Sequence, residues 1–420
     1  MSKPAAPKFI FVTLLLDIIG IGIVIPVLPE LVAQLLGGNE SEAARYYGPL
    51  VSLYAVMQVL FAPLLGALSD RFGRRPVLLI SLAGMGISYL ILGFAPTLGW
   101  LYVGRALAGI TGATITTANA YMADISTAET RAANFGLIGA AFGVGFVLGP
   151  ATGGILGEIG PRVPFFASAG VVFLNAMWGL WVLPESLPPE RRRPISRAEL
   201  IPLSGLRSLR ISPLVTGLAV VSLLSALGQR GLESVWVLHA GLRYGWGELE
   251  NGLSLTVVGL SAAIVQGGLV RRIVPRLGEP RAVQLGLLLG AVSMLLYGLA
   301  DQGWMIFLIV PIGSLGAISG PALMGLVTGA VDPQHQGAVQ GALASLQSVG
   351  TVAAPLLTTT LFAIATDGTL PKPLPGLPFF ACSGAVLLAW GAAWLTLRSL
   401  PPAPPSEASV PPGEAEAPVG

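Results

Sequence analysis

Charged side chains are scarce in this 420-residue chain: Asp, Glu, Lys and Arg make up 10% of it, whereas 53% is hydrophobic. An ordinary soluble domain has about 25% charged residues, so the composition predicts an integral membrane protein. The apolar runs are long and do not alternate with polar residues, as the strands of an outer-membrane barrel would. We therefore expect an all-α membrane protein whose helices cross the bilayer.

Cysteine and histidine are also nearly absent. Cys382 is the single cysteine, which excludes an internal disulfide and a cysteine-based metal site. His239 and His335 are the two histidines, which excludes a histidine-rich metal cluster. The net charge of +2 gives no electrostatic footprint for nucleic acid. No Gly-x-x-x-x-Gly-Lys-Ser/Thr loop is present, so we expect neither an enzyme nor an ATP-driven pump.

Apolar runs between polar breaks predict twelve transmembrane helices in two groups of six. The runs cover residues 9–36, 47–69, 76–95, 99–122, 131–157, 163–183, 212–239, 249–271, 281–300, 303–328, 337–364 and 377–398. We expect an N-terminal six-helix bundle over 1–183, a cytoplasmic linker over 184–211, a C-terminal bundle over 212–398 and a disordered tail over 399–420.

Basic residues fall mainly on one side of the predicted spans. Placing both termini in the cytoplasm leaves only Arg45, Arg162, Arg243 and Lys372 in the outer loops, as expected from the excess of Lys and Arg in cytoplasmic loops. The first run lacks an Ala-x-Ala cleavage site and is expected to be a retained span. We therefore predict a multi-pass protein of the cell inner (cytoplasmic) membrane, surrounded by lipid and monomeric.

The two groups of helices repeat at one constant offset. The matching pairs are Gly136 with Gly341, Gly145 with Gly350, Pro150 with Pro355, and Arg71-x-Gly73 with Arg276-x-Gly278. An internal duplication explains these matches. Two pseudo-symmetric six-helix bundles are typical of secondary transporters, whose substrate site lies between the halves near the bilayer midplane.

A charged segment lies between the second and third predicted helices. It reads Gly66-Ala-Leu-Ser-Asp70-Arg71-Phe-Gly73-Arg74-Arg75. Positive-inside topology alone explains its arginines, but neither the acid nor the glycines, which let helices approach closely. The pattern resembles the signature loop of the major facilitator superfamily.

That resemblance implies a cytoplasmic gate. In the family the acid caps a helix of the opposite half and the arginines pair with the end of the fourth helix. The matching partners here are Asp124 and the start of the eleventh helix near Gln336 and Gly337. The gate residues are then Gly66, Asp70, Arg71, Gly73, Arg74, Arg75, Asp124 and Arg131.

The fifth predicted helix carries a ridge of small residues around a proline. These residues are Gly145, Gly149, Pro150, Gly153 and Gly154. Helix packing alone explains such a ridge. The pattern is also similar to the motif that marks antiporters within the superfamily, which favours efflux by antiport.

Four ionisable residues within apolar runs are candidates for a role in transport. Asp17 is expected at mid-membrane, where a carboxyl that alternately meets water and a cationic drug can exchange a proton for substrate; the alternative is a hydrogen-bonded structural acid. Arg105 needs a buried partner or water, and the family links it to proton transfer. Arg230 and Glu233 are spaced to form an ion pair; we expect it near the outer surface, or facing the cavity if that helix is tilted or broken. Asp17, Arg105 and Glu233 are the proton-coupling candidates.

Polar side chains in otherwise apolar helices are candidates for the lining of a substrate cavity. They are Gln58, Asn119, Gln229, Arg230, Gln266 and Gln347. A few such groups can orient an amphiphilic ligand. Hydrogen bonds between helices are the alternative for each of them.

The resemblance narrows to the tetracycline-resistance efflux proteins over about residues 10–395. Strings that carry it include Leu-Leu-Asp17-Ile-Ile-Gly-Ile-Gly, Tyr54-Ala-Val-Met-Gln58, Gly109-Ile-Thr-Gly-Ala113, Val235-Trp236-Val-Leu and Gln336-Gly337-Ala-x-Gln340-Gly341. The likeness implies proton-coupled export of a divalent-metal–tetracycline complex, with the proton gradient as energy source and no cofactor.

Three positions depart from that family. Members of that family carry an acid in helix 3, a histidine in helix 8 and an acid in helix 9. This chain has Ser88, Ala262 and Gly290 at these places. A broad-specificity exporter of lipophilic cations or lipids is therefore the alternative function. A non-transporting membrane sensor is a further alternative, although it would usually carry a soluble domain.

Overall fold

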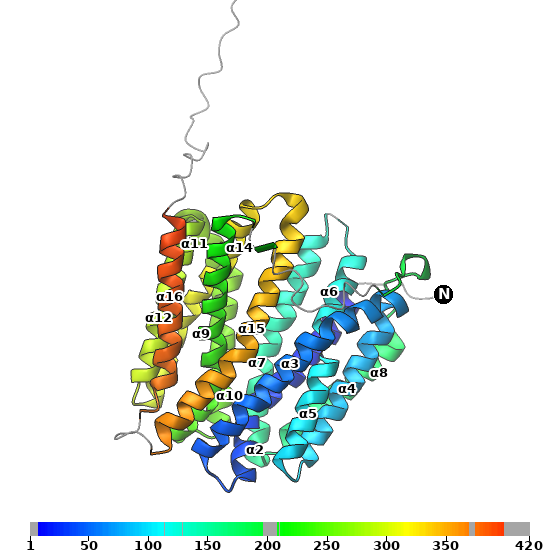
Figure 1. Cartoon of the computed structure of the whole chain (residues 1–420). Coiled ribbons are helices and arrows are strands. Elements are labelled where there is room, and N and C mark those ends of the chain that lie inside the picture. Colours follow the sequence, from blue (N-terminus) through cyan, green and yellow to red (C-terminus); the bar gives the residue numbers. More distant parts are fainter. Residues whose placement is uncertain are drawn as a thin grey trace, which may run out of the picture.

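Helices make up almost all of the computed structural model (Figure 1). The structure describes residues 7–112, 114–127, 129–195, 208–209, 211–368 and 374–398. Within these ranges, eleven helical segments are long and apolar enough to cross a membrane. The segment over 98–124 makes a twelfth, interrupted at Gly112. The predicted all-α fold of twelve transmembrane helices is confirmed; the tail and residues 196–207 of the predicted linker lie outside the described residues.

The N-terminal half contains eight helices. They are α1 (Pro7–Val24), α2 (Leu28–Leu35), α3 (Glu40–Phe72), α4 (Arg74–Phe94), α5 (Leu98–Thr111), α6 (Thr114–Asp124), α7 (Arg131–Ile159) and α8 (Val163–Val182). Helix α1 packs against α7 and α8, and α4 packs against α5 and α8. A short 3₁₀ turn, Pro189–Arg191, follows this half.

The C-terminal half repeats this organisation. Its elements are α9 (Pro213–Tyr244), α10 (Glu248–Ile264), the π-helical turn η4 (Val265–Leu269), α11 (Val270–Leu277), α12 (Glu279–Leu299), α13 (Gly303–Leu315), the 3₁₀ turn η5 (Gly316–Ile318), α14 (Ser319–Gly329), α15 (Pro333–Thr366) and α16 (Leu377–Leu397). Helix α9 packs against α15 and α16, and α12 packs against α16.

Four of the predicted spans are not continuous α-helices. The run 9–36 divides into α1 and α2 at a turn containing Pro26, which has no N–H to continue the helix. The run 99–122 divides into α5 and α6 at Gly112, whose carbonyl oxygen accepts a hydrogen bond from Gln58 Nε2 (3.1 Å). The π-helical turn η4 and the 3₁₀ turn η5 interrupt the runs 249–271 and 303–328. Apolar periodicity marks a span but not such local changes of hydrogen bonding.

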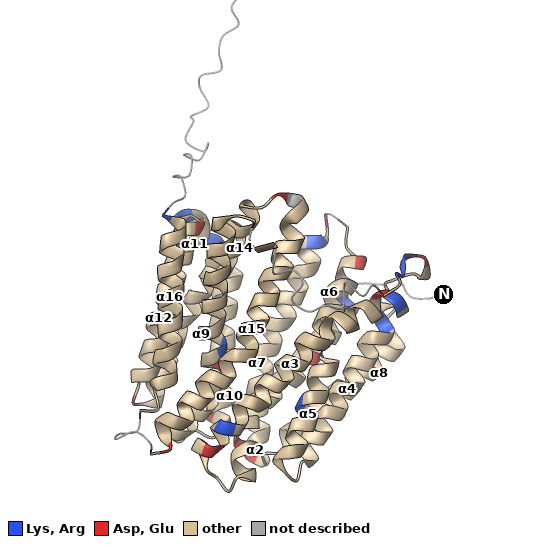
Figure 2. Ribbon diagram, in the orientation of Figure 1, with Lys and Arg blue, Asp and Glu red and all other residues tan. Residues whose placement is uncertain are grey.

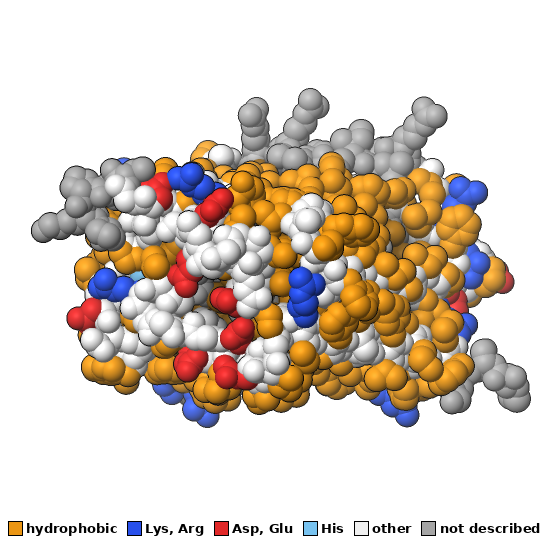
Figure 3. Space-filling model, turned by 90° about the horizontal axis from the view of Figure 1, so that it is seen from below, with side chains coloured by type: hydrophobic (Ala, Val, Ile, Leu, Met, Phe, Trp, Pro, Cys, Tyr) orange, Lys and Arg blue, Asp and Glu red, His pale blue; other side chains and the backbone are white. Residues whose placement is uncertain are grey.

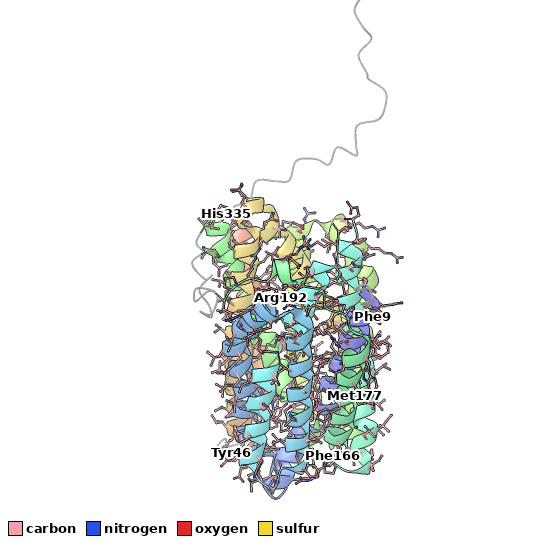
Figure 4. All side chains as sticks on the ribbon, turned by 90° about the vertical axis from the view of Figure 1, so that its right-hand side faces the viewer. Phe9, Tyr46, Phe166, Met177, Arg192 and His335 are labelled. Carbon is pink, nitrogen blue, oxygen red and sulfur yellow. The ribbon has the colours of Figure 1, made fainter. Side chains whose placement is uncertain are left out.

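The two ends of the helical bundle differ in how closely the halves meet. We call the end with Asp70–Arg75 and Pro333 the motif end, and the end with the 36–39 and 245–247 turns the closed end. Figure 4 shows His335 at the motif end and Tyr46 and Phe166 at the closed end. Cβ atoms added at glycines of α3, α7 and α15 toward the motif end would meet nothing within 4 Å, as at Gly66, Gly136 and Gly337.

At the closed end the two halves are in direct contact. Ser41 Oγ hydrogen-bonds Thr366 Oγ1 (2.8 Å), and Ser52 Oγ donates to the carbonyl oxygen of Val352 (2.8 Å), so α3 is tied to α15. Arg45 forms an ion pair with Asp367 just beyond α15. The helices α7 and α10 also pack together across the halves. The structure is therefore sealed at the closed end.

Candidate functional site

Asp17 lies in the middle of α1 and is buried. Its residue is 1% exposed, and its Oδ1 atom is buried without a hydrogen-bond partner among the described residues. Asn175 Nδ2 and Ser168 Oγ of α8 donate to the carbonyl oxygens of Thr13 and Gly20 (2.8 and 3.0 Å), which holds α8 against α1 on either side of Asp17. Figure 2 shows that charged residues at this depth are few. An ionised carboxylate there is costly unless a partner or water reaches it.

Arg105 in α5 finds an aromatic partner rather than an acid. Its guanidinium carbon lies 4.2 Å from the centroid of the Tyr54 ring of α3, within the range of a cation–π interaction. Gln58, one turn after Tyr54, donates from Nε2 to the Tyr54 hydroxyl (3.2 Å) as well as to Gly112. The Arg105 Nε atom is buried without a hydrogen-bond partner in the described part of the chain.

Two tyrosines lie within electrostatic range of both the acid and the arginine. Tyr54 and Tyr89 each interact electrostatically with both Asp17 and Arg105. Neither Asp17 nor Arg105 takes part in any ion pair of the described residues. A buried acid and a buried cation that are not neutralised by one another can each respond to a proton or a charged ligand. This cluster of Asp17, Tyr54, Tyr89 and Arg105 is the candidate coupling site.

The charged segment of the motif end is organised around Arg74, which is itself buried. The Arg74 Nε atom donates to Asp124 Oδ2 at 3.0 Å, and Nη1 donates to Ser69 Oγ at 2.7 Å. Arg74 also forms an ion pair with Asp70, one turn before it in sequence. Of the arginines expected to pair with the end of the fourth span, Arg74 is thus paired with Asp124.

Glu185, which follows α8, completes this network. Its carboxylate accepts from the backbone N–H groups of Arg74 (2.8 Å) and Arg75 (3.2 Å), so it caps the first turn of α4. Gly73 adopts φ +107°, and a Cβ atom there would lie 2.3 Å from Glu185 Oε2, so only glycine fits. Arg75 also donates to the carbonyl oxygen of Leu180 in α8.

The prediction that Asp70 contacts the opposite half is wrong for this conformation. Asp70 pairs with Arg74, while Gln336 Nε2 donates to the carbonyl oxygens of Thr328 and Val331 within its own half. Gly66 was expected to allow close helix packing, yet a Cβ there would meet nothing within 4 Å. The physical reason for both differences is that the halves are apart at the motif end.

The two remaining gate candidates are exposed at the motif end. Arg71 stacks over the neighbouring Phe72 ring, with 5.2 Å between the guanidinium carbon and the ring centroid. Arg131 is the first residue of α7. Neither side chain is held by a hydrogen bond of the described network around Arg74.

The glycines of α7 serve two interfaces. Cβ atoms at Gly145, Gly149 and Gly153 would lie 2.6, 2.7 and 2.2 Å from atoms of α1, so these three bring α7 onto the helix that carries Asp17. A Cβ at Gly154 would instead lie 2.7 Å from the Glu248 carbonyl oxygen in the opposite half. The carbonyl oxygen of Pro150 likewise lies 2.5 Å from a Cβ built at Gly252. The small residues of this motif therefore allow close approach both within and between the halves.

Arg230 and Glu233 form the ion pair that their spacing predicts. Arg230 Nη1 lies 2.7 Å from Glu233 Oε2, and both side chains are about half exposed. Gln229 Nε2 also donates to Glu233 (3.3 Å). The expected position near the outer surface rested on a span that ends at residue 239. Helix α9 continues to Tyr244, so the pair lies further from the helix end than expected.

The polar candidates for cavity lining do not form one cluster. Gln347 of α15 donates to Ser222 Oγ of α9 (3.1 Å), which is the helix-to-helix alternative. Gln58 supports the break at Gly112, Asn119 of α6 is partly buried, and Gln266 is exposed within the π-helical turn. Two small cavities of about 10 and 30 Å³ lie elsewhere, and neither is lined by these residues.

Several contacts of the site were not predicted from the sequence. Tyr54 has a signal, because it lies one helical turn before Gln58 on α3. Glu185 also has a signal in the sequence, since it closely follows a predicted span and its carboxylate needs a partner. The ion pair between Arg45 and Asp367 has no such signal, because 322 residues separate the two in the chain.

Comparisons with known proteins agree with this geometry. Residues 10–355 match the family model described as Major Facilitator Superfamily. Tetracycline resistance protein, class C, from Escherichia coli is 42% identical over 351 residues, which covers 84% of this chain and 88% of that protein. The class D protein from Salmonella ordonez is 37% identical over 373 residues, 88% of this chain and 93% of its own.

Solved structures show the same fold. The crystal structure of the human organic anion transporter MFSD10 is 28% identical, with a TM-score of 0.68, and the match covers 92% of this chain and 98% of that one. The crystal structure of the nucleoside transporter NupG matches with a TM-score of 0.76 at 12% identity over 93% of this chain and 99% of its own, which speaks for the fold alone. The chain is therefore a multi-pass membrane transporter, not an enzyme, and it belongs to the Major Facilitator Superfamily.

Proposed function

We propose that this chain exports a tetracycline-like drug in exchange for protons. The observation that carries the proposal is Asp17, a buried carboxyl with an unpartnered oxygen, which acts on Tyr54 and Tyr89 as the buried Arg105 also does, while no acid of the described residues forms an ion pair with that arginine. The relatives named tetracycline resistance proteins support the choice of substrate. The substrate would travel as a complex with a divalent metal ion.

Transport then proceeds by alternating access. The N-terminal bundle (1–183) and C-terminal bundle (212–398), joined by the linker 184–211, rock against each other around the helices α3, α7, α10 and α15. In this cycle, substrate enters between the halves while the motif end is open. Opening of the closed end releases it and exposes Asp17 to protons from outside.

The roles of the site residues follow from this cycle. Asp17 carries the proton, and Arg105 and Glu233 assist the coupling. Substrate contacts come from Gln58, Asn119, Gln229, Arg230, Gln266 and Gln347. Asp70 moves from Arg74 to the start of α15 when the motif end closes, where a carboxylate at a helix N-terminus gains about 0.3–2 kcal/mol. The motif end faces the cytoplasm of a cell whose inner membrane holds the protein as a monomer.

A second candidate is the export of lipophilic cations or lipids without a metal. It is favoured by the environments of Ser88 and Gly290, two of the three departures from the tetracycline family. Ser88 is buried and donates to the carbonyl oxygen of Met85 (2.7 Å). Gly290 packs against the turn η5, where a Cβ at Gly316 would lie 3.1 Å from its Cα atom. These positions supply no charge for a metal complex.

A substrate panel separates the two candidates. Cells that express the chain are loaded with tetracyclines, lipophilic dyes or cationic antibiotics, and efflux is measured with and without a protonophore. The first proposal expects protonophore-sensitive efflux of tetracycline that depends on Mg²⁺. Efflux of the dyes alone would favour the second candidate, and efflux of neither class, with protein present in the membrane, would contradict both.

A further inference from the structure

Two arginines lie at the motif end of the C-terminal half. Arg281 is in the first turn of α12, and Arg398 directly follows the last residue of α16. Both are exposed, and neither takes part in an ion pair within the part of the chain that the structure describes. Arg74 of the N-terminal half, by contrast, pairs with Asp70 and Asp124. The C-terminal half therefore presents positive charge at this end that a ligand can neutralise.

The helices that carry these two arginines, α12 and α16, pack side by side (Figure 1). They run in opposite directions, since α12 begins at the motif end and α16 ends there. A Cβ atom built at Gly290 of α12 would lie 3.9 Å from Val386 Cγ1 of α16. At about 1.5 Å per residue from that contact, Arg281 lies roughly 14 Å and Arg398 roughly 18 Å toward the motif end. The two arginines thus reach nearly the same level on neighbouring helices.

Arg281 is the first residue of an exposed stripe on α12. The residues that follow it at alternating spacings of four and three are all apolar and exposed: Leu285, Leu288, Val292 and Leu295. Residues with this spacing lie on one face of a helix. In a membrane-spanning helix, such a face is covered by the acyl chains of lipids. Arg281 therefore lies where this lipid-facing stripe reaches the membrane surface.

Arg398 has the corresponding place on α16. Leu387, Leu388, Trp394 and Leu395 are exposed along this helix. The guanidinium carbon of Arg398 lies 5.2 Å from the centroid of the Trp394 ring, one turn before it. Tryptophan is enriched where a membrane span meets the headgroups. The Trp394 contact therefore holds the Arg398 guanidinium at headgroup level, next to the apolar face.

The charges around the two arginines favour an anion. Glu279 is close to Arg281 in sequence, but a Cβ atom built at Gly325 would meet its carboxylate, so that carboxylate lies against α14. Figure 2 shows basic residues at the motif end of α11 and α16. Figure 3 shows that acidic side chains gather on the opposite, closed end. A negatively charged headgroup is therefore attracted to this end of the molecule and repelled from the other.

Two arginines beside two apolar faces match the parts of a phospholipid. The guanidinium group presents N–H donors in the planar arrangement that phosphate oxygens accept. Acyl chains attached to that phosphate cover the leucines of both stripes. A zwitterionic headgroup also carries an ammonium group, which the arginines repel, whereas an anionic headgroup such as that of phosphatidylglycerol does not.

We propose that Arg281 and Arg398 bind the phosphate of an anionic phospholipid whose acyl chains lie along the exposed faces of α12 and α16. The lipid belongs to the leaflet at the motif end. Because it contacts the C-terminal half alone, it holds that half at a fixed depth while the N-terminal half moves against it. The site is separate from the export of drug proposed above and does not depend on what the protein transports.

Binding is tested on the purified full chain in detergent, without drug. Retained lipids are counted by native mass spectrometry during titration with phosphatidylglycerol or phosphatidylcholine. The wild type should bind phosphatidylglycerol more tightly than phosphatidylcholine. Arg281→Gln and Arg398→Gln should each weaken phosphatidylglycerol binding about fivefold. Arg272→Gln removes an equal charge from an exposed arginine of α11 and should leave the binding unchanged.

Two results of this titration would overturn the proposal. One is equal affinity of the wild type for the two lipids. The other is an equal loss in all three arginine variants, which would indicate a general attraction to positive charge rather than a site. Glycerol 3-phosphate, which has the phosphate without acyl chains, should not displace the lipid at equal concentration. Displacement would assign the arginines to a free phosphate and likewise overturn the proposal.

A fluorescence measurement locates the lipid without changing either arginine. The emission of Trp394 is obtained as the difference between the wild type and Trp394→Phe, which keeps an aromatic ring beside Arg398. Phosphatidylglycerol with brominated acyl chains should quench this emission at lower concentration than brominated phosphatidylcholine does. Equal quenching by the two lipids would contradict a site for anionic lipid at α16.

Discussion

Glu185 accepts a hydrogen bond at 2.8 Å from the backbone N–H of Arg74, so the end of α8 caps the beginning of α4. The same Glu185 oxygen accepts from the N–H groups of Ser186 and Leu187 (both 3.0 Å). Arg74 in turn reaches Asp124 at the end of α6. One carboxylate and one guanidinium thereby join α4, α6 and α8 at the motif end.

Removal of this cap should destabilise the N-terminal half. Glu185→Ala leaves the N–H groups of Arg74 and Arg75 without their acceptor, and loss of a helix cap costs about 0.5–2 kcal/mol. We expect a lower thermal unfolding temperature and reduced transport. Glu185→Gln keeps one acceptor oxygen and should fall between Glu185→Ala and the wild type in a thermal-shift assay.

Glycine is required at residue 73 and, in this conformation, not at residue 66. Gly73→Ala places a Cβ at φ +107° against Glu185, so it should cost about 1–3 kcal/mol of stability. Gly66→Ala meets open space and should leave the unfolding temperature unchanged. If Gly66 faces the opposite half once the motif end closes, the same variant will slow transport. An unfolding temperature for Gly73→Ala equal to that of the wild type would contradict the described cap.

The seal at the closed end can be locked by a disulfide. Ser41 and Thr366 hydrogen-bond across the halves, so cysteines at both positions should cross-link on mild oxidation in a Cys382→Ser background. Transport should stop on oxidation and return with reductant, because the closed end must open in every cycle. Each single-cysteine variant serves as control. Full transport by the cross-linked protein would exclude alternating access through this end.

The ring of Tyr54, rather than its hydroxyl, is expected to hold Arg105. Tyr54→Phe keeps the cation–π contact, worth about 0.5–2 kcal/mol, and loses the hydrogen bond from Gln58. Tyr54→Leu loses both. We therefore expect drug efflux close to wild type in the first variant and strongly reduced efflux in the second, with protein levels matched by immunoblot. Equal efflux in the two variants would assign no role to the ring.

The transmembrane helices could be predicted from the sequence because long apolar runs have one stable solution in lipid. The pairing of Arg74 with Asp124 was also accessible, since the motif specifies it. The partner of Asp70 could not be predicted, because it depends on which end of the molecule is open. The break at Gly112 and the cap by Glu185 rest on hydrogen bonds between distant segments, which periodicity does not encode. Asp17 could be predicted as a buried acid, but its electrostatic neighbours Tyr54 and Tyr89 could not, because they come from two other helices.

The exchange of protons for drug at Asp17 is tested most directly in everted membrane vesicles. The lumen is acidified by respiration, and luminal pH is followed with a fluorescent dye while tetracycline with Mg²⁺ is added. Wild-type vesicles should release protons on addition of drug, and vesicles with Glu42→Gln, a change to an exposed acid in the first turn of α3, should behave alike. Asp17→Asn, which keeps the shape of the side chain but cannot carry a proton, should bind drug and release no protons. Proton release from Asp17→Asn vesicles equal to that of the wild type would contradict the account.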